Sequence, residues 1–178
     1  VVLDEAYNEY LPPEDRFDST AWVRRFPNLL VSRTFSKAYG LAGLRVGYGV
    51  AQPALTDLLN RVRQPFNVNT PAQAAALAAL DDQAFLQRSY ELNRAGLREF
   101  EAAFDALGLS YVPSRANFVL VKVGAAARVY QELLKRGVIV RPVANYGLPE
   151  WLRVSVGLPA ENATFLAALP AALAAARG

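Results

Sequence analysis

Short apolar runs bounded by turns are the main feature along the chain, and they predict strands. They are nearly continuous and rich in β-branched residues, which is typical of strands buried on both faces of an α/β sheet. In the first third of the chain these runs cover residues 1–3, 28–32 and 45–50. In the C-terminal part they cover residues 110–112, 117–123, 138–141 and 151–156.

Helical periodicity occupies the intervals between these runs, because apolar residues recur there three and four positions apart. Ser19 and Thr70 are expected to cap two of the helices, since a hydroxyl oxygen accepts hydrogen bonds from the free backbone N–H groups of the first turn. Pro71 suits the first helical position, whereas Pro170 is expected to interrupt the last helix. The predicted helices are 19–25, 53–63, one that starts at 70, 81–107, 125–136 and 160–177.

The order of the elements predicts an α/β fold class in two parts. Residues 1–75 alternate strands and helices, as in a mostly parallel sheet with helices around it. Residues 76–178 contain a long connecting helix and then strands and helices that suit a small α+β domain. The chain opens directly in a strand-like run and has no Met, so we interpret it as the C-terminal portion of a longer polypeptide.

The charge pattern favours a solvated surface over a nucleic-acid partner. The net charge is +3, but the 19 Lys and Arg residues are scattered among 16 Asp and Glu residues without a basic run. No apolar run approaches the roughly 20 residues that span a bilayer, and no signal peptide is recognisable. We therefore expect no nucleic-acid partner, no membrane contact and a cytoplasmic location.

The absence of Cys and His narrows the chemistry further. It excludes a disulfide framework, a cysteine nucleophile and a histidine-based triad, and we expect no metal site. Any general base in this chain must therefore be Lys, Tyr, Asp or Glu.

Two polar motifs follow predicted strands, at the position where ligands bind in open α/β sheets. The first is Asp-Glu-Ala-Tyr at 4–7, which a simple strand-end turn also explains. The second contains Thr34, Ser36, Lys37 and Arg45. Hydroxyls and a guanidinium suit a phosphate, and a partly desolvated lysine among other cations loses its proton readily and attacks aldehydes. A polar loop with a surface lysine is the alternative, but the chain has few lysines and this one lies among glycines, aromatics and hydroxyls.

These motifs resemble the fold-type I pyridoxal 5′-phosphate (PLP) aminotransferases, and among them most closely the histidinol-phosphate aminotransferases. The resemblance rests on the Asp-Glu-Ala-Tyr motif at 4–7, the Ser-Lys dipeptide at 36–37 and the run Gly-Leu-Ala-Gly-Leu-Arg-Val-Gly-Tyr at 40–48. It continues as far as Gly157 and so covers nearly the whole chain. It implies that residues 1–75 are the end of the large cofactor-binding domain of this family.

The resemblance implies PLP as cofactor and assigns roles to six residues. Asp4 would pair with the pyridinium nitrogen, and Tyr7 would hydrogen-bond the phenolic oxygen of the ring. Lys37 would form the imine to the cofactor and then move a proton between the substrate Cα and the cofactor. The residues that would hold the cofactor phosphate are Thr34, Ser36 and Arg45.

The resemblance also implies a substrate-binding role for two arginines. Arg153 would receive the carboxylate of glutamate in one half-reaction and the phosphate of histidinol phosphate in the other, since a planar guanidinium suits both anions. Arg141 is a candidate for a second phosphate contact, and its alternative is a surface cation at a strand end.

The implied activity is transamination between histidinol phosphate and 2-oxoglutarate in histidine biosynthesis, by a homodimer that binds a small amino donor and a 2-oxo acid. A related aromatic aminotransferase and a phospho-amino-acid decarboxylase are the alternatives within the cofactor class. A non-catalytic fragment and a nucleotide-binding module that uses residues 40–49 are more remote, because the glycine spacing is not Gly-x-Gly-x-x-Gly. Since the family's ring-stacking aromatic and phosphate loop lie outside these 178 residues, we expect the chain alone not to turn over.

Overall fold

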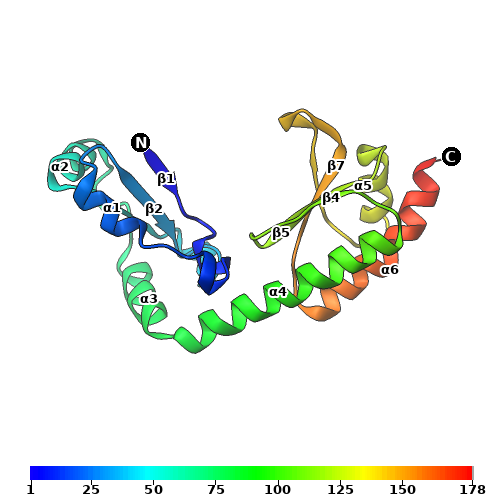
Figure 1. The fold of residues 1–178 in the computed structure, drawn as a ribbon, viewed down its shortest axis with the longest axis horizontal. Coiled ribbons are helices and arrows are strands. Elements are labelled where there is room, and N and C mark those ends of the chain that lie inside the picture. Colours follow the sequence, from blue (N-terminus) through cyan, green and yellow to red (C-terminus); the bar gives the residue numbers. More distant parts are fainter. Residues whose placement is uncertain (178) are drawn as a thin grey trace. The chain divides into compact units, whose positions relative to one another are not determined.

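A computed structural model describes residues 1–177 of the chain, which folds into two compact units. The first unit is Val1–Tyr90 and the second begins at Glu91. The division falls inside α4 (Gln83–Ala106), which Figure 1 shows as one continuous helix. The functional domain boundary that we expect after residue 75 stays a prediction.

The first unit contains a three-stranded sheet in the order β1 (Val2–Asp4), β2 (Leu30–Thr34), β3 (Gly47–Val50). β1 and β2 are parallel, with Leu3 opposite Val31. β3 is antiparallel to β2, so the part of the sheet carried by this chain is mixed. The α/β fold class is confirmed, whereas the expectation that all three strands are buried on both faces is wrong, since most of β3 is exposed.

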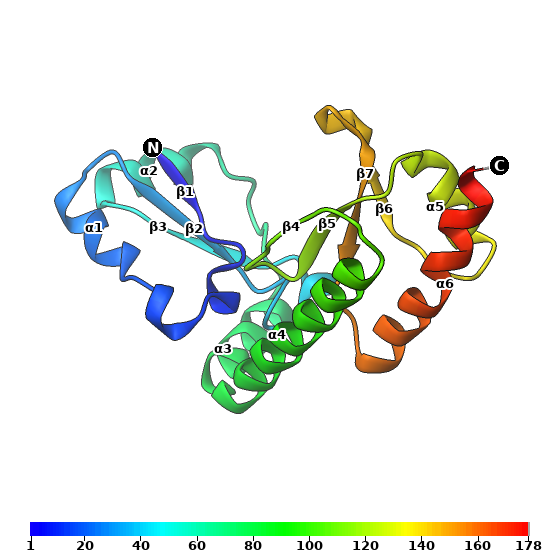
Figure 2. The same cartoon turned by 45° about the vertical axis from the view of Figure 1, so that its right-hand side comes forward.

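Helices and short turns surround this sheet. Figure 2 shows α1 beside β2, where Val23 packs with Leu29 and Val31 in a buried cluster. A second cluster joins the segment after β2 to α3 through Phe35 and Ala72. The helices of this unit before α4 are α1 (Ser19–Arg25), α2 (Pro53–Val62) and α3 (Thr70–Asp81), and 3-10 turns lie at Asn8–Tyr10, Pro13–Asp15 and Ala42–Leu44.

Two helix caps differ from the prediction. Asp18 caps α1, because its side chain accepts a hydrogen bond from the Ala21 backbone N–H at 3.1 Å. Asn69 caps α3 in the same way, accepting from Ala72 at 2.9 Å. Ser19 and Thr70, the predicted caps, are instead the first helical residues. In both cases the preceding Asp or Asn is at least as strong an N-cap as the hydroxyl residue, so the helix starts one position earlier.

The second unit contains an antiparallel four-stranded sheet covered on one face by helices. The buried side chains of β5 and β7, such as Val119 and Leu152, pack against Phe100 of α4 and Leu169 of the last helix. The strand order is β4 (Tyr111–Val112), β5 (Phe118–Lys122), β7 (Leu148–Ser155), β6 (Arg141–Val143), and the helices that follow α4 are α5 (Ala126–Leu134) and α6 (Pro159–Arg177).

Two predictions for the second unit are wrong in detail. The strand expected at 138–141 lies at 141–143, because Val138 continues the end of α5 by donating its backbone N–H to Leu133 O at 3.0 Å. The last helix is not interrupted at Pro170, since α6 continues through it with Leu169 and Leu173 packed in the core. Pro170 itself is exposed, so the core contacts on the other face of α6 hold the helix together.

Candidate functional site

The candidate site begins where the parallel strands β1 and β2 end. Asp4 lies opposite Ser32, whose hydroxyl is 3.5 Å from Asp4 Oδ1. The Ala6 backbone N–H also donates to this oxygen, at 3.1 Å. Because side chains alternate along a strand, Asp4, Ser32 and Thr34 lie on the same face of the sheet. The carboxylate is therefore held at the strand end by two donors and remains exposed on its outer side.

Lys37 lies beside Tyr7. Its Nζ is 5.8 Å from the centre of the Tyr7 ring, and both residues are half-buried. A tight turn fixes the lysine backbone, since the Gly40 N–H donates to Lys37 O at 2.9 Å. Gly40 has a positive φ of 72°, and a Cβ there would meet the Phe85 ring at 3.3 Å, so the turn suits glycine. The fold thus brings together an amine and a phenol that are distant in sequence.

Thr34 and Ser36 lie at the end of β2, and the backbone next to Arg45 reaches the same loop. Thr34 Oγ1 accepts a hydrogen bond from the Ser36 backbone N–H at 3.1 Å. The Phe35 N–H donates to Val46 O at 3.2 Å, which brings the backbone next to Arg45 to this loop. Arg45 has a left-handed φ of 53° and donates from Nη1 to Ala42 O at 2.9 Å. In this geometry its guanidinium stabilises its own loop.

Lys37 and the five candidates around it all lie in the first unit, at the ends of β1 and β2, in the segments that follow them, or just before β3. Together they offer a carboxylate, a phenol, an amine, two hydroxyls and a guanidinium. This donor set suits a ligand with a basic ring nitrogen, an aldehyde and a phosphate.

Arg141 and Arg153 lie in the second unit and face each other across β6 and β7. Residues directly opposite in an antiparallel pair project from the same face, so both guanidinium groups leave the sheet on one side. That side is opposite to the face that carries Leu152 and Val154, which are buried in the core. Arg153 is half-buried, with its guanidinium 4.2 Å from the centre of the Phe118 ring, and Arg141 is exposed. Two adjacent cations on an open face suit an anion.

The sequence analysis did not identify a buried polar network behind the strand ends. Arg33 Nε donates to Glu5 Oε2 at 2.9 Å, and Arg33 Nη2 lies 3.4 Å from Ser19 Oγ. Burial alone lowers the pKa of Arg33, but hydrogen bonds to Glu5 and Tyr48 outweigh it, so its pKa is raised. The sequence indicates this network only through Glu5 and Arg33, charged residues on the face that carries the apolar side chains of each strand.

Two further titratable groups lie near this network. Burial raises the pKa of Glu9, even though Arg33 and Arg16 act in the opposite direction. Burial also raises the pKa of Tyr39, and the nearby Glu9 carboxylate adds to this effect. The region behind the strand ends is therefore poorly solvated, and charge there is disfavoured unless it is paired.

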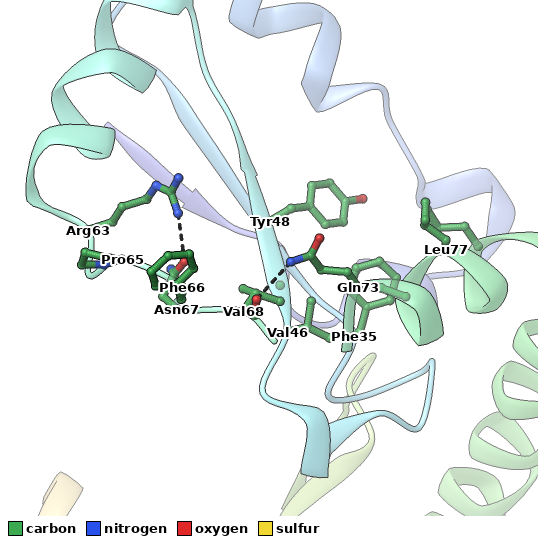
Figure 3. A pocket seen from close by; sticks show the side chains of 13 residues that line it. Phe35, Val46, Tyr48, Arg63, Pro65, Phe66, Asn67, Val68, Gln73 and Leu77 are labelled. Carbon is green, nitrogen blue, oxygen red and sulfur yellow. Dashed lines mark hydrogen bonds between the residues drawn. The ribbon is translucent and has the colours of Figure 1, made fainter. Parts of the chain in front are cut away.

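A cavity of about 950 Å³ lies on another side of the first unit. Phe35 and Tyr48 border it, and Figure 3 shows the segment 63–68 along its rim. That segment is held by two hydrogen bonds, from Arg63 Nη1 to Asn67 Oδ1 and from Gln73 Nε2 to Val68 O, both 3.0 Å long. The cavity is lined mainly by apolar side chains and by none of the six candidates around Lys37, so we do not assign the chemistry to it.

Residues 1–177 contain no group of three or more acidic side chains placed so that it could hold a metal ion. No helix in the same range is both long and apolar enough to cross a bilayer.

Comparison with known proteins identifies a family. The model of the family described as "Aminotransferase class I and II" matches residues 1–169. Histidinol-phosphate aminotransferase 2 of Ralstonia nicotianae is 71% identical over 180 residues, which cover 99% of this chain and 48% of that protein. Histidinol-phosphate aminotransferase 1 of Cupriavidus pinatubonensis is also 71% identical, over 97% of this chain and 47% of its own length.

Solved structures give the same result. The crystal structure of histidinol-phosphate aminotransferase from Sinorhizobium meliloti, in complex with pyridoxal-5′-phosphate, superposes with a TM-score of 0.88 at 33% identity. The match covers 97% of this chain and 48% of that one. This chain therefore spans about half the length of the relatives it matches.

Proposed function

This chain belongs to the class I and II aminotransferases, and we propose that the whole protein uses PLP to transfer an amino group between histidinol phosphate and 2-oxoglutarate. The observation that carries the proposal is the 71% identity to histidinol-phosphate aminotransferases across almost all of the chain. The neighbourhood of Lys37 supports it independently, because the residues gathered there have the chemistry that PLP requires. Histidine biosynthesis is the pathway that this activity serves.

The donor set fits PLP group by group. Asp4, a carboxylate at a strand end, would pair with the ring nitrogen and keep it protonated. Tyr7, whose ring centre lies 5.8 Å from Lys37 Nζ, would hydrogen-bond the phenolic oxygen. Thr34, Ser36 and Arg45 would offer hydroxyl and guanidinium donors to the phosphate. For this last role Arg45 would have to release its hydrogen bond to Ala42 O.

Lys37 is the catalytic residue of the proposal. When bound, PLP supplies an electron sink for the pair of electrons left at the substrate Cα after its proton departs. Lys37 would hold the cofactor through its aldehyde carbon and, once the substrate amine takes its place there, would accept the proton from the substrate Cα. The turn closed by Gly40 limits how far the amine can move between these tasks.

Arg153 and Arg141 are proposed to bind the substrate anions. The phosphate of histidinol phosphate and the carboxylates of glutamate both match a guanidinium fork, so the same arginines serve two unlike substrates. The Phe118 ring under Arg153 orients the fork and leaves its N–H edge free for hydrogen bonds. The homodimer and the cytoplasmic location expected from the family resemblance stay predictions.

The test is an assay of the whole protein with histidinol phosphate and 2-oxoglutarate, compared with aromatic amino donors. We expect Lys37→Ala to lose at least about a thousandfold in kcat, as removal of an essential acid–base group does. Lys135→Ala, which removes an exposed lysine at the C-cap of α5, is the matched control and keeps wild-type activity. Arg153→Gln is expected to raise KM for the phosphorylated donor more than for an unphosphorylated one.

Two outcomes would count against the proposal. Full activity of Lys37→Ala would show that another group performs the chemistry. Release of CO₂ from a phosphorylated amino acid, without transfer of its amino group, would favour the decarboxylase alternative within the same cofactor class.

A further inference from the structure

The Glu5–Arg33 ion pair lies directly beside the proposed cofactor residues in the chain. Glu5 follows Asp4, and Arg33 precedes Thr34. The Glu5 backbone N–H donates to Ser32 O at 2.9 Å, so the parallel pairing of β1 and β2 continues one residue past the end of β1. The side-chain pair therefore joins the two strands at the level where the candidate cofactor residues begin.

The pair occupies the face of the sheet opposite to Asp4 and Thr34. Side chains alternate along a strand, so Glu5 and Arg33 lie on the same face as Leu3 and Val31, the face that packs against α1. Arg33 Nη2 reaches Ser19 Oγ of α1 at 3.4 Å. The ion pair thus links β1 to β2 and, through Arg33, both strands to a helix, without occupying the space that a cofactor would need.

This pair is difficult to explain by stability alone. Glu5 is only 7% exposed, and its Oε1 has no hydrogen-bond partner among residues 1–177. A buried carboxylate with one unsatisfied oxygen carries a desolvation cost, and buried ion pairs can often be replaced by apolar residues without loss of stability. An apolar pair would, however, allow the strand ends to slide, whereas a directional hydrogen bond at 2.9 Å fixes them.

We propose that Glu5 and Arg33 are positioning residues, whose buried ion pair fixes the strand ends that carry Asp4 and Tyr7 on one side and Thr34 to Lys37 on the other. This inference rests on the proposed function. The groups that bind the ring nitrogen and those that bind the phosphate come from different strands, so a small shift between the strands moves one set away from the other. Tight binding of a rigid ligand requires both sets to be held at once.

The test measures cofactor binding in the whole protein. PLP is titrated into wild type, Glu5→Gln, Arg33→Gln and Arg33→Lys, and the visible circular dichroism band of the bound cofactor gives the dissociation constant and the band intensity per bound molecule. Loss of residues that orient binding groups costs about ten- to a hundredfold in affinity or activity in metal sites, so we expect about tenfold weaker PLP binding and a weaker band. Arg33→Lys keeps the charge and should lose less than Arg33→Gln.

Glu132→Gln is the matched control, because Glu132 of α5 also forms ion pairs, with Lys135 and Arg136, away from the first unit. It should bind PLP as wild type does. Unchanged PLP affinity and band intensity in Glu5→Gln would overturn the inference, even if its unfolding temperature falls. Should Glu5→Gln fail to fold, unchanged PLP affinity and band intensity in Arg33→Gln overturn it equally. A wild-type protein that gives no band at all would instead defeat the proposed function, and the inference with it.

Discussion

Glu9 is a carboxylate in surroundings that disfavour its charge. It lies in the 3-10 turn Asn8–Tyr10, near Glu5, Arg33 and Arg16. Burial raises its pKa above the ordinary value of 4.5, and the two arginines do not cancel this effect. The folded protein therefore holds the Glu9 proton more tightly than the unfolded chain does. The stability that this gives is present below pH 4.5 and is lost as pH rises through the raised pKa.

We predict that Glu9→Gln raises the unfolding temperature of the whole protein relative to wild type at about pH 7 and leaves it nearly unchanged at about pH 3, where Glu9 is protonated in both states. The measurement is thermal unfolding across this range, with the exposed Glu14→Gln as control. A Glu9→Gln protein that is less stable than wild type at neutral pH would show that attraction to the arginines outweighs burial.

At the residue scale, local motifs were predictable and long-range partners were not. Asp4, Tyr7 and Lys37 each lie in a short run whose residue types already suggest a chemistry. The Glu5–Arg33 pair joins residues 28 positions apart, and it forms only because β1 and β2 pair in one parallel register. A one-residue change of register would send these side chains to opposite faces, and nothing local specifies it.

α6 contains a proline in an interior position. Pro170 has no backbone N–H to donate to Leu166 O, and its ring crowds the preceding turn. The helix nevertheless continues, because Phe165, Leu169 and Leu173 are buried in the core of the second unit. Packing thus outweighs an unfavourable local preference.

We predict that Pro170→Ala stabilises the protein by about 2 kcal/mol, since an interior proline costs about 3 kcal/mol relative to alanine and the freer unfolded chain returns about 0.4–1 kcal/mol. Thermal or denaturant unfolding measures the change. Pro159→Ala is the control, because a proline in the first position of α6 costs the helix little. Equal or lower stability of Pro170→Ala would mean that the helix bends at this point to make contacts that a straight helix loses.

At the element scale, periodicity predicts that a helix exists but not where it ends. α1 and α3 each begin one residue after an Asp or Asn, which caps the helix in place of the hydroxyl residue next to it. The position of β6 depends on its partner, because the strand forms where Arg141 and Pro142 can pair with β7. Its apolar neighbours Val138 and Val140 are buried without joining the sheet.

At the scale of the whole molecule, the first unit leaves large apolar side chains in contact with solvent. Val62 is 79%, Phe66 97% and Leu77 68% exposed, and all three lie between α2 and α3 or on these helices. The relatives are about twice as long as this chain. We infer that other parts of the whole protein cover this surface.

We predict that the 178-residue chain produced alone has no transaminase activity and binds a hydrophobic dye more strongly than the whole protein does. Phe66→Ser combined with Leu77→Ser should reduce this dye binding without restoring activity. Full turnover by the 178 residues unaided would contradict the prediction.

The fold class is predictable from this sequence because strand-like and helical runs alternate along it, and the family is predictable because the motifs at 4–7, 36–37 and 40–48 resemble those of the aminotransferases. The compact units are less predictable: the division between them falls after Tyr90, inside α4, where the helical pattern itself has no break. The antiparallel direction of β3 is not predictable from its own residues, since an apolar run has the same pattern in either direction.

Arg141 and Arg153, which face each other across β6 and β7, affect both the stability of this sheet and its proposed binding of anions. Like charges directly opposite each other repel, and this weakens strand pairing as long as no anion lies between them. A neutral residue at position 141 or 153 would remove this repulsion and strengthen the strand pairing. On the proposed function, it would also weaken the binding of phosphate. The stability of the sheet and the binding of substrate therefore favour different residues at these two positions. On the proposed function, a bound substrate anion removes the repulsion between the two arginines.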